Sequence, residues 1–126
     1  MSRKLDYNYC HAAPILEWMS HKWAVVTLLH LKEAHTNNNA TGVRFSSLFR
    51  AIPHISEKML ASVLDYLEKE GLVKRIVYKD IPLHVEYALT PLAESFLREI
   101  SYVVEWGQQH YEEIIRSRNE IEEQKV

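Results

Sequence analysis

The side chains with the greatest intrinsic reactivity in this chain are one thiol and seven imidazoles. Cys10 is the only cysteine, so it cannot form a disulfide within the chain or complete a zinc or iron–sulfur site alone. The seven histidines contain no i, i+4 pair and no His-Glu-x-x-His motif. We therefore expect no metal site and no cofactor.

Enzymatic chemistry is also not expected. Cys10 with a distant histidine would formally make a nucleophile and base, but no local signature of such a pair is present. The three glycines, Gly42, Gly71 and Gly107, are too far apart for a phosphate-binding loop or a dinucleotide fingerprint. Positive charge from His11 or from nearby Lys4 and Arg3 would favour the reactive thiolate of Cys10.

Length and composition are those of one ordinary globular domain. The chain has 126 residues, of which 47% are hydrophobic and 25% charged. No apolar run approaches the roughly 18 residues that span a bilayer, and the first residues lack the apolar core of a signal peptide. We expect a cytoplasmic protein with no membrane association.

Charge is distributed unevenly along the chain, although the net charge is only −2. Residues 42–79 hold seven positive and four negative side chains, whereas residues 91–126 hold four positive and eight negative ones. A basic centre beside an acidic end is typical of a small nucleic-acid binder with a separate partner surface.

Four helices are predicted in the first half of the chain. The dense apolar residues of 14–31 predict a short helix to about Met19 and a second over about 22–34, with Ser20 as the N-cap between them. The polar segment 35–42 predicts a loop, and residues 44–52 predict a third helix. Ser56 caps the fourth helix, which Gly71 closes.

The fourth helix is amphipathic. Its apolar stripe predicts burial of Leu60, Val63, Leu64 and Leu67. The opposite face carries Lys58, Ser62, Asp65 and Lys69, flanked by Met59, Ala61 and Tyr66. We expect that face to be exposed.

A β-hairpin and a long helix are predicted next. The β-branched and aromatic residues of 73–79 and 85–89 predict two strands joined by a turn. Thr90 and Pro91 then predict the start of a helix over 91–117, followed by a charged, frayed tail over 118–126.

This order of elements is typical of a winged helix, in which the second helix of a helix-turn-helix enters the major groove and the hairpin touches the DNA backbone. The predicted fold class is α+β, mainly helical: one winged-helix domain over 1–117, with helices at 14–31, a helix-turn-helix at 44–70 and the wing at 73–89.

Five segments with compatible spacing also carry a family resemblance. They are Lys22-Trp23, Arg44-Phe45-Ser46-Ser47-Leu48, Ile55-Ser56-Glu57-Lys58-Met59-Leu60, 64–75 and Val85-Glu86-Tyr87-Ala88-Leu89-Thr90. Together they resemble the HxlR family of bacterial transcriptional regulators over about residues 10–106. The resemblance implies a MarR-like winged-helix homodimer that binds an inverted-repeat operator in double-stranded DNA.

Candidate site residues follow from the order of the predicted elements and from the family resemblance. The predicted DNA contacts are Arg44, Ser56, Lys58, Met59, Ser62, Tyr66, Arg75 and Lys79. Where members of the family often carry an arginine on the reading face, this chain has Asp65, so its operator is expected to be unusual or its binding weakened.

The resemblance also implies dimerisation through N-terminal and C-terminal helices, which places Ile15, Trp18, Tyr102 and Trp106 at the interface. In several members of the family the N-terminal cysteine senses oxidants, and Cys10 occupies that position, although His11 follows it where the family usually has proline. We predict a repressor switched by thiol oxidation or a small ligand. The alternative is a winged-helix interaction module that has lost sequence-specific DNA binding and acts through its acidic final helix.

Overall fold

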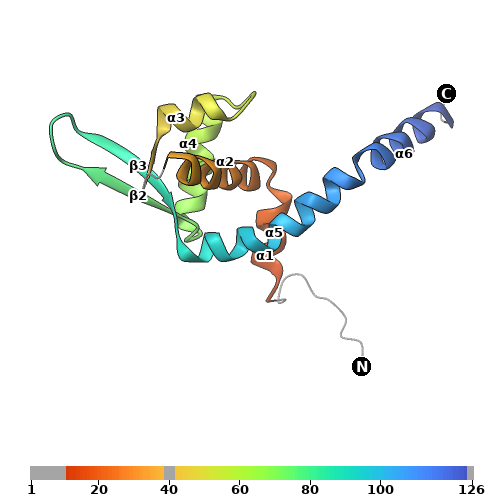
Figure 1. Cartoon of the computed structure of the whole chain (residues 1–126), viewed down its shortest axis with the longest axis horizontal. Coiled ribbons are helices and arrows are strands. Elements are labelled where there is room, and N and C mark those ends of the chain that lie inside the picture. The colour runs from red at the N-terminus through yellow and green to blue at the C-terminus, as the bar shows by residue number, and fades with distance from the viewer. Residues whose placement is uncertain (1–10, 39–41, 125–126) are drawn as a thin grey trace. The chain divides into compact units, whose positions relative to one another are not determined.

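The structure is a computed structural model that describes residues 11–38 and 42–124 (Figure 1). The chain divides into two compact units, residues 1–94 and residues 95–126. Cys10, the predicted redox-sensing residue, lies outside the described residues.

Two helices begin the first unit, α1 (Ala13–Ser20) and α2 (Lys22–Asn38). The predicted cap between them is corrected: Nδ1 of His21 accepts from the Ala24 backbone N–H at 3.2 Å, whereas the Ser20 hydroxyl donates to the Glu17 carbonyl oxygen. The prediction of a loop from residue 35 is also wrong as far as Asn38, because no glycine or proline stops α2 before that point.

The sheet has three antiparallel strands, β1 (Val43–Arg44), β2 (Val73–Tyr78) and β3 (His84–Leu89), in the order β1-β3-β2. The predicted hairpin is confirmed, with a one-residue difference at two strand ends. The short strand β1 was not predicted. It begins after Gly42, where an added Cβ would lie 2.9 Å from the Cβ of Glu86 and 2.8 Å from its Oε1.

The helix-turn-helix consists of α3 (Phe45–Ala51) and α4 (Glu57–Lys69). Both predicted ends of α4 are confirmed: the Ser56 Oγ accepts from the Met59 backbone N–H at 3.0 Å, and Gly71 takes a φ of 76°. Such a positive φ suits glycine, because an L side chain there meets its own backbone.

The core of the first unit is built around α2, which packs against α1, α3, α4 and the sheet. The predicted apolar stripe of α4 is fully buried, and so are leucines of α2, α3 and the residue before β2. The largest fully buried side chains are Leu28, Leu31, Leu48, Leu60, Leu64, Leu67 and Leu72. Thr27 of α2 is buried among them, and its Oγ1 has no hydrogen-bond partner among the described residues. These contacts fix α4 so that only one face reaches solvent.

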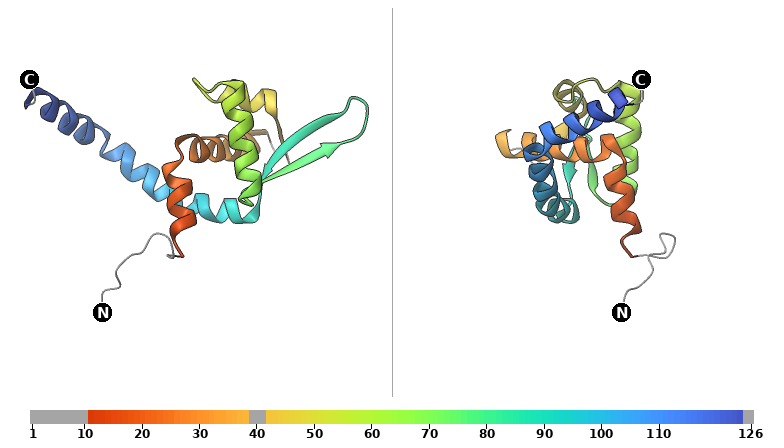
Figure 2. Two further views of the ribbon diagram at one scale, coloured as in Figure 1. Left: turned by 180° about the vertical axis from the view of Figure 1, so that it is seen from behind. Right: turned by 90° about the vertical axis from the view of Figure 1, so that its right-hand side faces the viewer.

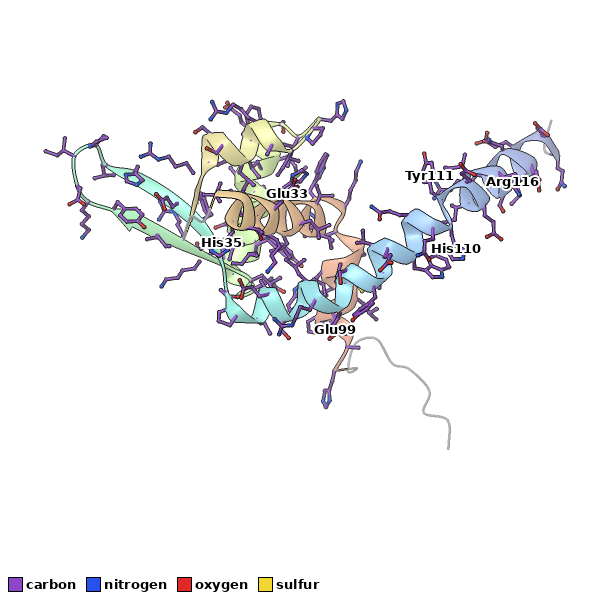
Figure 3. All side chains as sticks on the ribbon, viewed as in Figure 1. Glu33, His35, Glu99, His110, Tyr111 and Arg116 are labelled. Carbon is purple, nitrogen blue, oxygen red and sulfur yellow. The ribbon has the colours of Figure 1, made fainter. Side chains whose placement is uncertain are left out.

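The C-terminal helix differs from its prediction. It is two helices, α5 (Pro91–Gln109) and α6 (Tyr111–Gln124), and the segment predicted as a frayed tail is helical as far as Gln124. The break falls at His110, whose ring Nδ1 lies 2.8 Å from the Trp106 carbonyl oxygen that its own backbone N–H also uses (Figure 3). The helix persists beyond it because residues 111–124 contain neither glycine nor proline.

The start of α5 matches its prediction. The Thr90 Oγ1 accepts from the Ala93 backbone N–H at 3.2 Å, with Pro91 at the first helical position. The same hydroxyl donates to the Gly71 carbonyl oxygen at 2.7 Å, so it also satisfies a backbone group released where α4 ends.

Candidate nucleic-acid interface

The exposed face of α4 carries the residues predicted to read DNA. Lys58, Met59 and Ser62 are exposed, as are Ala61 and Asp65, while the opposite face is buried. Ser56 lies just before the first turn, and its hydroxyl oxygen accepts from Met59 while its own O–H stays available to donate. The first turns of a recognition helix are the part that meets base edges in the major groove.

Asp65 is paired along the same face. Its Oδ2 lies 2.9 Å from the Lys69 Nζ one turn later, and this hydrogen bond is the main reason that the pKa of Lys69 is raised. Both side chains remain exposed, so the pair adds little stability. Its effect is local, because the lysine offsets the carboxylate charge that DNA phosphates would otherwise repel.

Tyr66 lies on the flank of α4 rather than on its open face. Its ring stacks on the ring of His21, with centroids 5.1 Å apart, and partial burial is the main reason that the pKa of its hydroxyl is raised. The charges of Glu70 and Glu17 raise this pKa further. The predicted contact between Tyr66 and DNA would therefore involve the border between α4 and the start of α2.

The hairpin, whose strand β2 packs against α4 (Figure 2), supplies a second group of cations. Lys74 and Arg75 of β2 are exposed, and so is Lys79 just beyond the strand. The carboxylate of Glu86 on β3 already has a partner, because its Oε2 lies 3.1 Å from the Nε2 of His84. The predicted contact Arg44 is exposed on β1, at the edge strand of the same sheet.

The predicted dimer residues fall into two groups. Ile15 is exposed on α1, and in the second unit Tyr102 and Trp106 are 70% and 56% exposed. Trp18 differs, because it is only 8% exposed and its Nε1 donates to the Glu70 Oε1 at 2.8 Å. Trp18 therefore belongs mainly to the core of the first unit, a role that its helical spacing alone did not distinguish from an interface.

Sequence reasoning missed the hairpin turn as a candidate contact. Ile81 and Leu83 are strongly exposed there. The available signal was three apolar residues in a row, Ile81-Pro82-Leu83, at a place where turns usually carry polar residues.

Metal chemistry has no support in the described part of the chain, where no cluster of three histidine, cysteine or acidic side chains could hold an ion. No helix among the described residues is long and apolar enough to cross a membrane.

Comparison with known proteins decides the family. Residues 18–115 match the HxlR-like helix-turn-helix family, from the end of α1 into α6. The chain belongs to this family. Its relatives are transcriptional regulators, and the HxlR-like chain is accordingly a transcriptional regulator with a DNA-binding helix-turn-helix. The predicted family and the predicted mainly helical, winged helix-turn-helix fold are confirmed.

Individual relatives agree with this HxlR-like assignment. The HTH-type transcriptional regulator YtfH of Escherichia coli strain K12 is 36% identical over 111 residues, which are 88% of this chain and 82% of YtfH. A structure of a MarR-family transcriptional regulator from Porphyromonas gingivalis W83 aligns with a TM-score of 0.69 and 34% identity, covering 84% of this chain and 97% of that one. The oxidised form of the redox regulator HypR aligns with a TM-score of 0.66 and 29% identity, covering 79% of this chain and 96% of the HypR chain.

Proposed function

We propose that this regulator binds an inverted-repeat operator as a homodimer in the cytoplasm and acts as a repressor. In each half-site α4 enters the major groove, and the hairpin cations contact phosphates. The observation that carries this proposal is the exposed face of α4, which begins at the Ser56 cap and lies beside the basic strand β2.

The homodimer is supported by the second unit. Tyr102, Val103 and Trp106 of α5 are exposed, as are Tyr111 and Ile121 of α6. A hollow of about 490 Å³ on these helices is lined by Trp106, His110, Glu113, Ile114, Ser117, Arg118 and Ile121. Burying these side chains against a second copy would remove apolar surface from water. A dimer would also supply two recognition helices, one for each half-site of an inverted repeat.

Regulation by an oxidant is supported by the likeness to HypR, which is a redox regulator. Cys10 is the only thiol available for such a role. The test is to compare the DNA affinity of wild type and Cys10→Ser before and after oxidant. A loss of affinity in wild type alone would support the switch, and equal responses would remove Cys10 from it.

DNA binding itself is tested by fluorescence anisotropy at two salt concentrations, using the duplex immediately upstream of the protein's own gene and a scrambled competitor. Specific binding should exceed non-specific binding by at least about 10³. Because each phosphate contact contributes about 0.9 to the salt slope, Lys58→Ala in both protomers should reduce the slope by about 1.8.

The matched control is Lys32→Ala, which removes an exposed lysine of α2 outside the predicted interface. This variant should retain the wild-type affinity and slope. Weak, sequence-blind binding by wild type, unchanged in Lys58→Ala, would refute the proposal and favour the interaction module that acts through its acidic helix.

A further inference from the structure

The turn between β2 and β3 presents an apolar tip. Ile81 is 101% exposed and Leu83 is 70% exposed, and Pro82 between them is exposed as well. None of these side chains contributes to the core of the first unit. Figure 1 shows the hairpin extending well beyond α2, α3 and α4, so this tip is its outermost part.

The base of the tip is held firmly. Tyr78 and His84 are paired across the strands, and their rings stack with centroids 4.6 Å apart and an interplanar angle of 12°. The His84 Nδ1 also lies 3.3 Å from the Pro82 carbonyl oxygen, while its Nε2 contacts Glu86. These contacts hold the turn in its extended position. Ile81 and Leu83 can therefore enter a narrow groove without first folding back onto β2 and β3.

The charge along the hairpin fits DNA better than an apolar protein partner. Lys74, Arg75 and Lys79 are exposed along the arm, and the exposed acidic residue at the turn is Asp80. The arm also joins the proposed DNA-binding surface directly, because β2 packs against α4. Phosphates that line a groove would therefore meet the cations while the tip meets the groove floor.

We infer that Ile81 and Leu83 form a wedge that enters the minor groove beside the half-site and parts a base step. This inference rests on the proposed DNA binding. Aliphatic side chains that enter the minor groove unstack base pairs and kink the duplex by about 20–90°. A tip that only read groove width or neutralised phosphates would require arginine or lysine, and residues 80–83 contain neither.

The experiment uses a duplex selected from a random library by the wild-type protein. A 2-aminopurine base, whose fluorescence rises when it is unstacked, is placed in turn at each position flanking a half-site. Bending is measured on the same duplex by the distance between end-attached dyes. The variants are Ile81→Ala/Leu83→Ala and Lys79→Ala, with Lys32→Ala as the control for an exposed residue outside the hairpin and the open face of α4.

We expect wild type to raise the fluorescence several-fold at one flanking step and to bend the duplex by at least about 20°. The double variant should bind the same half-sites with both signals lost. Lys79→Ala should weaken binding but retain the bend at saturation, and Lys32→Ala should match wild type. Thermal unfolding would verify that the double variant folds, as the exposure of its two sites implies.

Two results would overturn the inference while leaving the proposed function intact. One is saturable wild-type binding with no fluorescence rise at any flanking position. The other is a double variant that bends and unstacks the duplex like wild type. If wild type selects no sequence from the library at all, the proposed function fails, and the wedge fails with it.

Discussion

The N-cap of α4 links stability to DNA binding through one hydroxyl. In Ser56→Ala the Met59 N–H loses the acceptor that now lies 3.0 Å away. Loss of a serine N-cap costs about 1 kcal/mol. For a chain of 126 residues, that corresponds to a decrease of about 4 °C in Tm. The first turn of α4 should fray, so the affinity for DNA should fall as well.

Ser56→Asp separates these two effects. Aspartate is an equally good N-cap and interacts favourably with the helix dipole, so the Tm should stay within about 1 °C of wild type. Its negative charge would lie at a predicted DNA contact and would be repelled by the DNA phosphates, so DNA affinity should fall at least about tenfold at low salt.

Calorimetry and anisotropy on the same preparations test both expectations. An unchanged Tm in Ser56→Ala would show that the hydroxyl does not support the helix. Undiminished binding by Ser56→Asp would show that the start of α4 does not approach the DNA backbone, which would contradict the proposed docking.

Three further substitutions probe the first unit. Trp18→Phe should lower the free energy of unfolding by about 1–2 kcal/mol in urea titrations, because the Glu70 carboxylate loses its indole donor; an unchanged midpoint would contradict this. Thr27→Val should raise stability by about 1 kcal/mol in the same assay, since it replaces a buried hydroxyl that has no partner, and a loss would show that the hydroxyl is satisfied. The raised pKa of Tyr66 means that the folded state holds this proton more tightly than the unfolded state. Stability should therefore fall as pH rises above about 10, and Tyr66→Phe should reduce that fall; equal pH profiles would refute it.

The elements that could be predicted from sequence are those whose causes are local. The Ser56 cap, the four-residue apolar stripe of α4 and the positive φ at Gly71 all lie within one helix and its ends. The hairpin is likewise predicted by local residues, because strand-forming side chains lie on both sides of a turn. The exposed face of α4 followed directly from these features.

The features that could not be predicted depend on distant partners. Strand β1 has only two residues and exists because it pairs with β3. Trp18 is buried against a residue 52 positions away, and Tyr66 is covered by His21 of another segment. No periodicity encodes such contacts, so helical spacing did not separate core from interface for Trp18 and did not predict that His21 stacks on Tyr66.

The close approach of Gly42 to Glu86 has a consequence for interpreting mutants. An alanine at position 42 would push against the Cβ and Oε1 of Glu86, whose other carboxylate oxygen contacts His84 at the base of the turn. The Cβ cannot move without the strand, so the disturbance would pass along β3. A genetic screen would then score Gly42→Ala as defective in DNA binding, although Gly42 is not among the predicted DNA contacts, because the orientation of the hairpin would change.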